Sequence, residues 1–127
     1  VEKKYSAQIE KKNLHLDIKL GDEKLYIGRT ALKIVLSNLM SNATKYNVND
    51  GKINIGVKDG WLYVENTGEN LGELNLDRIF EIGFSLDKEN GNGIGLYVVS
   101  NILINYGIEH KIDMNGDRFI FLIKLNA

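Results

Sequence analysis

The chain has 127 residues, a length that fits one domain with a two-layer core and is too short for two independent domains. Its 43% apolar and 26% charged residues are ordinary for a globular protein, and a net charge of -1 gives no basic field for nucleic acid. The absence of cysteine excludes disulfides and thiolate metal sites, and the two histidines lack the HxH or HxxxH spacing of a zinc site.

Residues 1–12 are charged and weakly patterned, and we interpret them as the end of an upstream helix or linker. Residues 13–127 are expected to form the single domain. No apolar run approaches the roughly 20 residues that span a bilayer, and no signal peptide opens the chain. The lack of cysteine fits a reducing, cytoplasmic setting. We expect a cytoplasmic domain, with any membrane attachment of the natural protein in segments missing from this sequence.

The first predicted element of the domain is a strand at residues 13–20. Leucine and isoleucine alternate there with polar residues, which is the period of a half-buried strand. The apolar positions are Leu14, Leu16, Ile18 and Leu20. A turn at residues 21–22 follows.

Residues 29–46 are predicted to form a long amphipathic helix. Apolar residues recur there at spacings of three and four, at Leu32, Val35, Leu36, Leu39 and Ala43. At about 100° per residue, Ser37, Ser41 and Thr44 fall opposite this stripe, whereas Asn38, Asn42 and Lys45 fall at its rim. Asparagine is a poor helix former, so two asparagines one turn apart indicate a functional reason, although rim asparagines also bond nearby backbone.

Two short strands with a two-residue Asp59-Gly60 turn form a predicted hairpin at residues 52–65. The second strand leads into Asn66-Thr67-Gly68 and then into a polar loop at residues 69–75. Residues 76–80 resemble a short helical turn, and the polar residues 81–90 suit a mobile lid.

Gly91, Gly93 and Gly95 alternate immediately before a second apolar helical pattern. Such a glycine loop leading into a helix N-terminus suits a phosphate, because the first-turn amides lack partners and carry partial positive charge. The same glycines are equally compatible with a flexible turn. A Rossmann fingerprint is excluded because no strand runs into the glycines, and a Walker loop because Gly-Lys-Ser/Thr is absent.

The chain is predicted to close with a capped helix and a hairpin. The second helix carries Val98, Val99, Ile102, Leu103 and Tyr106 at helical spacing. Gly107 is then a candidate left-handed cap. Residues 108–114 and 118–125 form the predicted hairpin, around a turn at residues 115–117.

Four stretches, in this order and spacing, resemble the N, G1, F and G2 boxes of sensor histidine kinases. They are NLMSNATKY at residues 38–46, VENTG at 64–68, RIFEIGF at 78–84 and GNGIGLYVV at 91–99. The resemblance implies the catalytic ATP-binding domain of that family. Its fold is an α/β two-layer sandwich of the Bergerat type, in which a mixed, mainly antiparallel sheet packs on one layer of helices.

The resemblance also implies a site for ATP and Mg²⁺. Asn42 matches the magnesium ligand, Asn38 the residue that supports the metal's water shell or a phosphate, and Asn66 the acceptor for the adenine amino group. Lys45 suits a phosphate contact, Tyr46 the adenine or ribose, and Phe80 the anchor of the lid. The remaining nucleotide-binding positions are Gly68, Gly91, Gly93, Ile94, Gly95 and Leu96.

Three positions depart from the family pattern. Asn66 stands where most members carry aspartate, and its amide oxygen still supplies an acceptor for the adenine amine. The glycine-rich continuation of the G1 box is reduced to Gly68-Glu69-Asn70. In the F box, Gly83 replaces a phenylalanine and Ser85 an arginine, so Lys88 is the candidate phosphate contact there.

The family's phosphoacceptor histidine box is absent, and His15 and His110 fall in predicted strands. The resemblance therefore implies that γ-phosphate passes to a histidine on a separate dimerisation domain, and then to a response regulator, in a homodimeric full-length protein. Two alternatives remain. One is an ATPase of the same fold, which requires a glutamate where Asn38 stands, and the other is a nucleotide-binding module without kinase activity.

Overall fold

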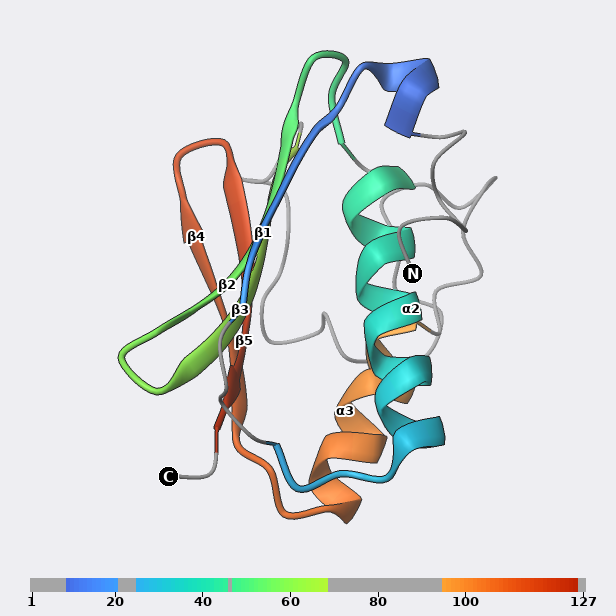
Figure 1. The fold of residues 1–127 in the computed structure, drawn as a ribbon, viewed down its shortest axis with the longest axis vertical. Helices are drawn as coiled ribbons and strands as arrows, with labels where there is room; N and C mark the ends of the chain where they lie inside the picture. The colour runs from blue at the N-terminus through green and yellow to red at the C-terminus, as the bar shows by residue number, and fades with distance from the viewer. Residues whose placement is uncertain (1–8, 21–24, 46, 69–94, 126–127) are drawn as a thin grey trace.

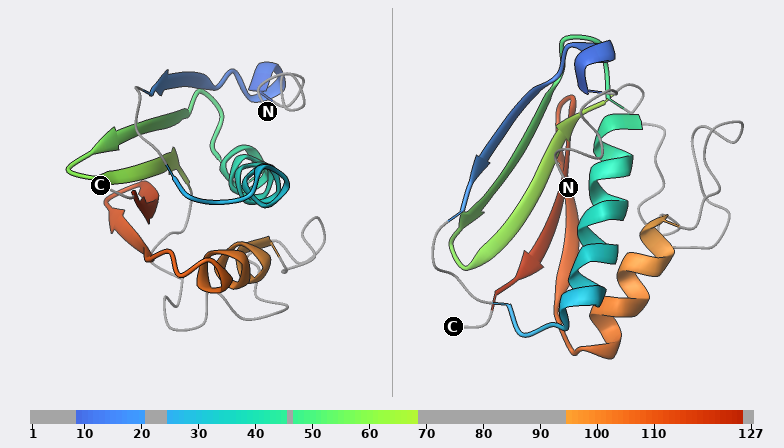
Figure 2. Two further views of the ribbon diagram at one scale, coloured as in Figure 1. Left: turned by 60° about the horizontal axis from the view of Figure 1, so that its bottom comes forward. Right: turned by 45° about the vertical axis from the view of Figure 1, so that its right-hand side comes forward.

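The computed structural model describes residues 9–20, 25–45, 47–68 and 95–125. A five-stranded sheet forms one layer, and two helices, α2 (Arg29–Lys45) and α3 (Gly95–Asn105), lie together on one of its faces (Figures 1 and 2). The opposite face of the sheet carries no helix in the described ranges. This arrangement confirms the predicted two-layer sandwich.

The strands follow the spatial order β1-β2-β3-β5-β4. Their bounds are β1 His15–Lys19, β2 Lys52–Lys58, β3 Trp61–Thr67, β4 His110–Asn115 and β5 Arg118–Lys124. β1 pairs with β2 in parallel, and the other three pairings are antiparallel. A parallel pair requires a crossover, which α2 provides on the covered face.

Both hairpin turns have the backbone that their residues predict. Asp59 and Gly60 have φ of 53° and 83°, the two positive angles of the type I′ turn that suits a twisted hairpin. In the second hairpin Asn115 pairs with Arg118, so the turn is Gly116-Asp117 alone, one residue shorter than predicted. Gly116 has φ of 63°, the angle that a glycine at the first central position allows.

Gly107 ends α3 as predicted. Its φ is 68°, its amide donates to Ile104 O, and the amide of Ile108 donates to Leu103 O. These two bonds form a Schellman motif, which satisfies carbonyls of the last turn. The motif directs the chain back toward β4, and it buries Ile108 against the core.

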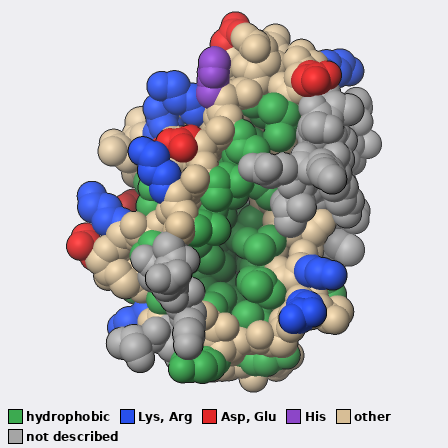
Figure 3. Space-filling model, in the orientation of Figure 1, with side chains coloured by type: hydrophobic (Ala, Val, Ile, Leu, Met, Phe, Trp, Pro, Cys, Tyr) green, Lys and Arg blue, Asp and Glu red, His purple; other side chains and the backbone are tan. Residues whose placement is uncertain are grey.

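The core lies between the helices and the covered face of the sheet. From α2 it takes the predicted Val35, Leu39 and Ala43, together with Met40, which the predicted stripe did not include. They pack in one cluster with further buried residues, among them Ile53, Val64, Val99, Leu103, Phe121 and Ile123. In Figure 3 hydrophobic side chains fill the seam between the two layers, and the charged side chains lie around it.

The polar face of α2 differs from the prediction at Thr44. The prediction placed Thr44 opposite the apolar stripe, but it is 2% exposed, and Ser37 and Ser41 are half-buried. The reason is that other segments close over the C-terminal end of α2: Lys12 Nζ donates to Thr44 O, and the chain after the helix turns back along it. The Thr44 hydroxyl is satisfied by donating to Met40 O and Ser41 O.

The first strand is shorter than predicted. Asn13, with φ of 52°, closes the helical turn at residues 9–12, and β1 begins only at His15. Leu14 is buried, but Ile18 is 38% and Leu20 58% exposed. β1 lies at the edge of the sheet, so its alternating pattern gives less burial than an inner strand would have. No described helix is long and apolar enough to cross a membrane.

Candidate nucleotide-binding site

Asn38, Asn42 and Lys45 lie on α2 at intervals of four and three residues, so they follow one side of the helix. Asn38 and Asn42 are half-buried, which confirms their predicted position at the rim of the core, and Lys45 is exposed. Asn38 Nδ2 donates to Ile34 O at 2.9 Å. That bond uses the donor end of the Asn38 amide and leaves its oxygen as an acceptor.

Asn66 is buried, at 7% exposure. It lies on β3 two residues after Val64, hence on the same covered face of the sheet. Its Nδ2 donates to Thr67 O at 2.8 Å. Because a carbonyl oxygen only accepts, this bond fixes which end of the amide is which.

The Oδ1 atom of Asn66 is consequently available to a ligand. It has no hydrogen-bond partner among the described residues. An acceptor on a buried, oriented amide is what recognition of an exocyclic amine requires.

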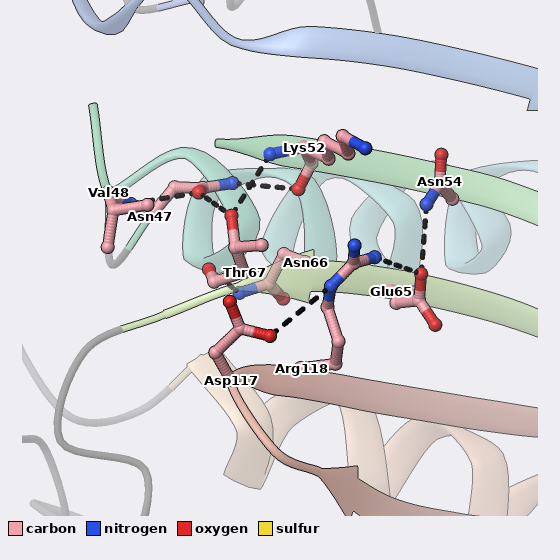
Figure 4. Close-up of polar contacts among 9 residues, drawn as sticks. All are labelled: Asn47, Val48, Lys52, Asn54, Glu65, Asn66, Thr67, Asp117 and Arg118. Carbon is pink, nitrogen blue, oxygen red and sulfur yellow. Dashed lines mark hydrogen bonds and ion pairs between the residues drawn. The ribbon is translucent and has the colours of Figure 1, made fainter. Parts of the chain in front are cut away.

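A polar network joins the end of α2 to the end of β3 (Figure 4). Asn47 lies two residues after the helix and is 8% exposed. Its Nδ2 donates to Lys52 O at 3.0 Å, and its Oδ1 accepts from the amide of Val48 at 2.8 Å and from the Thr67 hydroxyl. Thr67 in turn accepts from the amide of Lys52 at 3.0 Å.

This network holds the helix that carries Asn42 and Lys45 against the strand that carries Asn66. Gly51 leaves room for it, since a Cβ at that position would meet Asn47 Oδ1 and Thr67 Oγ1. Sequence reasoning did not identify the network. The only available signal was polar, turn-forming residues on both sides of a strand start, which is common to many loops.

A second cluster lies beside β3 on the uncovered face of the sheet. Arg118 Nη1 pairs with Glu65 Oε1 at 2.8 Å, the same oxygen accepts from Asn54 Nδ2 at 2.9 Å, and Arg118 Nε lies 3.5 Å from Asp117 Oδ1 (Figure 4). The amide of Gly68 donates to Asp117 O at 3.0 Å. These contacts fix the chain where β3 ends, directly after Asn66.

The predicted second helix is confirmed, and α3 begins at Gly95, the last of the three glycines. The first amides of α3, those of Gly95 and Leu96 among them, lack partners within the helix and favour an anion. α2 and α3 lie side by side on the sheet (Figure 2). Six predicted positions lie outside the described residues, as does the proposed lid: Tyr46, Phe80, Lys88, Gly91, Gly93 and Ile94.

The described residues contain no group of three or more His, Asp or Glu side chains that could hold a metal ion. At the rim of α2 a divalent cation would meet the amide of Asn42, with water and the nucleotide phosphates as further oxygen ligands. Mg²⁺ suits that mixture, because it is bound in proteins through few side chains and keeps several waters. The half-buried amide of Asn42 fits such a role.

Comparison with known proteins agrees with this geometry. Residues 28–127 match the family described as histidine kinase-, DNA gyrase B- and HSP90-like ATPase. Sensor histidine protein kinase HK06 of Streptococcus pneumoniae is 39% identical over 85 residues, 64% of this chain and 19% of that protein. Sensor protein kinase GraS of Staphylococcus aureus is 26% identical over 117 residues, 86% of this chain and 33% of that protein.

Solved structures share the fold. The nucleotide-free catalytic domain of histidine kinase ThkA superposes with a TM-score of 0.82 at 24% identity, covering 98% of this chain and 87% of that one. Histidine kinase AdeS of Acinetobacter baumannii gives a TM-score of 0.75 at 24% identity, covering 98% of this chain and 60% of that one. The chain spans a fifth to a third of the length of the two sequence relatives. It belongs to the family of histidine kinase-, DNA gyrase B- and HSP90-like ATPases, and corresponds to the ATP-binding domain of sensor histidine kinases.

Proposed function

We propose that this domain binds MgATP and donates its γ-phosphate to a histidine on a separate dimerisation domain of the same kinase. The observation that carries the proposal is the pair of amides Asn38 and Asn42, one turn apart at the rim of α2. Both side chains can hold a hydrated cation and a phosphate, and neither can accept a proton at neutral pH.

Each half of the nucleotide has a proposed set of contacts. The Oδ1 atom of Asn66 accepts from the adenine amino group, while Lys45 and the first amides of α3 contact phosphate. Asn42 holds Mg²⁺, whose charge offsets that of the phosphates when it is bound. Tyr46, Phe80 and the glycines at positions 91 and 93 are proposed to complete the site.

The residue at position 38 favours kinase over ATPase. ATPases of this fold place a glutamate there to deprotonate the attacking water, and the amide of Asn38 cannot do so. Hydrolysis is therefore slow, and the phosphate is kept for a better nucleophile. In the transfer, an imidazole nitrogen forms the bond to the γ-phosphorus as the bond to the ADP oxygen breaks, so ADP leaves.

Neither histidine of the chain suits the role of acceptor. His15 begins the edge strand β1 and is exposed. His110 is held in the fold, with its Nε2 3.1 Å from Ser100 Oγ and its ring 5.9 Å from that of Phe121. The acceptor is therefore proposed to lie in the part of the natural kinase that this chain does not cover.

The full-length protein is proposed to be a homodimer that passes phosphate onward to an aspartate of a response regulator. The catalytic domain is proposed to be cytoplasmic, with membrane attachment through segments outside this chain. These proposals rest on the type of relative that the chain matches, and they do not depend on the contacts within the domain.

Binding is tested by calorimetry with ATP, in the presence and absence of Mg²⁺. We expect Mg²⁺ to strengthen binding by the unaltered chain. The variant Asn42→Ala should lose that gain, and Asn49→Ala, an exposed asparagine after the helix, should keep it. Equal dependence on Mg²⁺ in the Asn42 variant would remove Asn42 from the metal site.

Transfer is tested with γ-labelled ATP, the chain, and a separately supplied dimerisation and histidine-phosphotransfer domain of its own kinase. We expect acid-labile label on the supplied domain, none on the chain, and little free phosphate. Rapid release of phosphate without the acceptor would favour an ATPase. Firm binding of ATP without transfer to the matched acceptor would favour a nucleotide-binding module.

A further inference from the structure

Lys12 makes an unusual contact for a surface lysine. Its Nζ donates to three backbone carbonyls at the C-terminal end of α2 and just beyond: Thr44 O and Lys45 O at 2.8 Å, and Asn47 O at 3.2 Å. An ammonium group has three donors, and all three have a carbonyl within reach. Lys12 therefore caps the helix that carries the amide pair, from more than 30 residues away in sequence.

The backbone of Lys12 is itself fixed. The turn at residues 9–12 ends in a Schellman motif, in which the amide of Asn13 donates to Glu10 O and that of Leu14 to Ile9 O. The amide of Asp50 donates to Lys12 O at 2.8 Å, and Asn13 Nδ2 donates to Asp50 Oδ1 at 2.6 Å. Figure 1 shows this turn, in blue, next to the end of α2.

The last turn of a helix has two properties that matter for a polyanion. Its carbonyls lack partners within the helix, so the turn frays, and they carry a partial negative charge. α2 has one lysine in its last turn, Lys45, whose side chain is exposed. The Lys12 ammonium holds the backbone of Lys45 and offsets the negative end of the helix, one turn beyond Asn42.

We propose that Lys12 is a positioning residue for the phosphate half of the nucleotide site, acting through Lys45 and Asn42. This inference rests on the proposed binding of MgATP. Through Lys12, the segment that precedes β1 is connected to the site, so a shift of that segment changes the affinity for phosphate. The adenine half of the site, where Asn66 on β3 is proposed to contact the base, does not depend on Lys12.

A purely structural cap would stabilise the domain without distinguishing between ligands. Comparison of MgATP with adenosine separates the two possibilities, since adenosine lacks phosphates and depends only on the base-binding half. Lys12→Met removes the ammonium and keeps most of the side-chain length. Lys11→Met is the matched control, because Lys11 is the exposed neighbour in the same turn. Lys12→Arg restores a cation that can donate to several carbonyls.

The experiment uses the 127-residue chain and each variant, with calorimetry for MgATP and NMR titration for adenosine. Urea unfolding followed by the fluorescence of Trp61, the single tryptophan, establishes that each variant is folded at the titration temperature. We expect Lys12→Met to weaken MgATP binding by about two- to fivefold, the change that corresponds to a typical charge at a helix end, with adenosine affinity unchanged. Lys12→Arg should recover most of the loss, and Lys11→Met should bind as the unaltered chain does.

Three results would overturn the inference. The first is unchanged MgATP affinity in a folded Lys12→Met chain, and the second is an equal loss of affinity for MgATP and adenosine in that variant. The third is an equal loss of MgATP affinity in Lys11→Met, which would show that only the net charge of the chain matters. Failure of the unaltered chain to bind MgATP would overturn the proposed function and this inference together. Binding by the unaltered chain and Lys12→Met alike would overturn the inference alone.

Discussion

Replacement of Asn47 by alanine tests whether the network between α2 and β3 holds the site together. The side chain makes three hydrogen bonds, donating to Lys52 O and accepting from the Val48 amide and the Thr67 hydroxyl. Alanine would remove all three at a position that is 8% exposed. The Val48 amide and the Thr67 hydroxyl would then lack this acceptor, and Lys52 O would lack this donor.

The magnitude follows from those three bonds. A hydrogen bond contributes about 1 kcal/mol net, and a buried group left unpaired costs about 1–3 kcal/mol. Partial access of water to the loop keeps the total near the lower end, at about 3 kcal/mol. For a domain of this size that loss corresponds to a melting temperature lower by roughly 10 °C.

The assay is urea unfolding followed by Trp61 fluorescence, with differential scanning calorimetry as a second measurement. Asn49→Ala is the control, since Asn49 is exposed two residues further along, and it should change stability by less than about 0.5 kcal/mol. Asn47→Asp keeps the oxygen that accepts from Val48 and Thr67, but it places an acceptor oxygen against Lys52 O, so it should destabilise the domain as well.

A double-mutant cycle with Thr67→Val isolates the bond between the two side chains. We expect the summed losses in free energy of unfolding of the two single variants to exceed the loss of the double variant by about 0.5–3 kcal/mol. The reason is that both single variants lose the same interaction. A loss below about 1 kcal/mol in Asn47→Ala, or additive losses in the cycle, would refute the reasoning that this network joins helix and strand.

Two further predictions follow from the same region. Gly51→Ala should destabilise the domain by about 1–3 kcal/mol, because the new Cβ would meet the Asn47 and Thr67 side chains and lie 2.9 Å from Val48 O. Gly28→Ala is the control. Its Cβ meets only the end of the exposed Tyr106 side chain, so its stability to urea should change little. Asn66→Ala should weaken ATP binding by on the order of 1 kcal/mol and reduce the preference for ATP over GTP in competition titrations, and an unchanged preference would place adenine recognition elsewhere.

The amino-acid sequence alone was sufficient for several local elements. The apolar spacing predicted α2 to within one residue at its C-terminal end, and the Asp59-Gly60 pair predicted a hairpin whose turn has the expected positive φ angles. Gly107 was predicted as a left-handed cap and has φ of 68°. Periodicity, turn residues and caps depend on residues that are close in sequence, so they can be recognised without the rest of the fold.

The sequence also placed the candidate site residues on their elements. Asn38, Asn42 and Lys45 lie along one side of α2, Asn66 lies near the end of β3, and Gly95 begins α3. That result came from motifs with fixed order and spacing. The roles of these residues toward ATP and Mg²⁺ stay predictions.

What only the tertiary structure decided involves residues that are distant in sequence. Thr44 is buried although its helical position predicted exposure, because Lys12 and the chain after α2 close over it. The donor end of the Asn66 amide is fixed by Thr67 O, so its oxygen is the end left for a ligand. Asn47 meets Thr67 over 20 residues and Lys12 meets Lys45 over 33. No periodic pattern encodes such pairs, because their contacts arise only when the sheet order brings the end of α2, the start of β2 and the end of β3 to one edge of the domain.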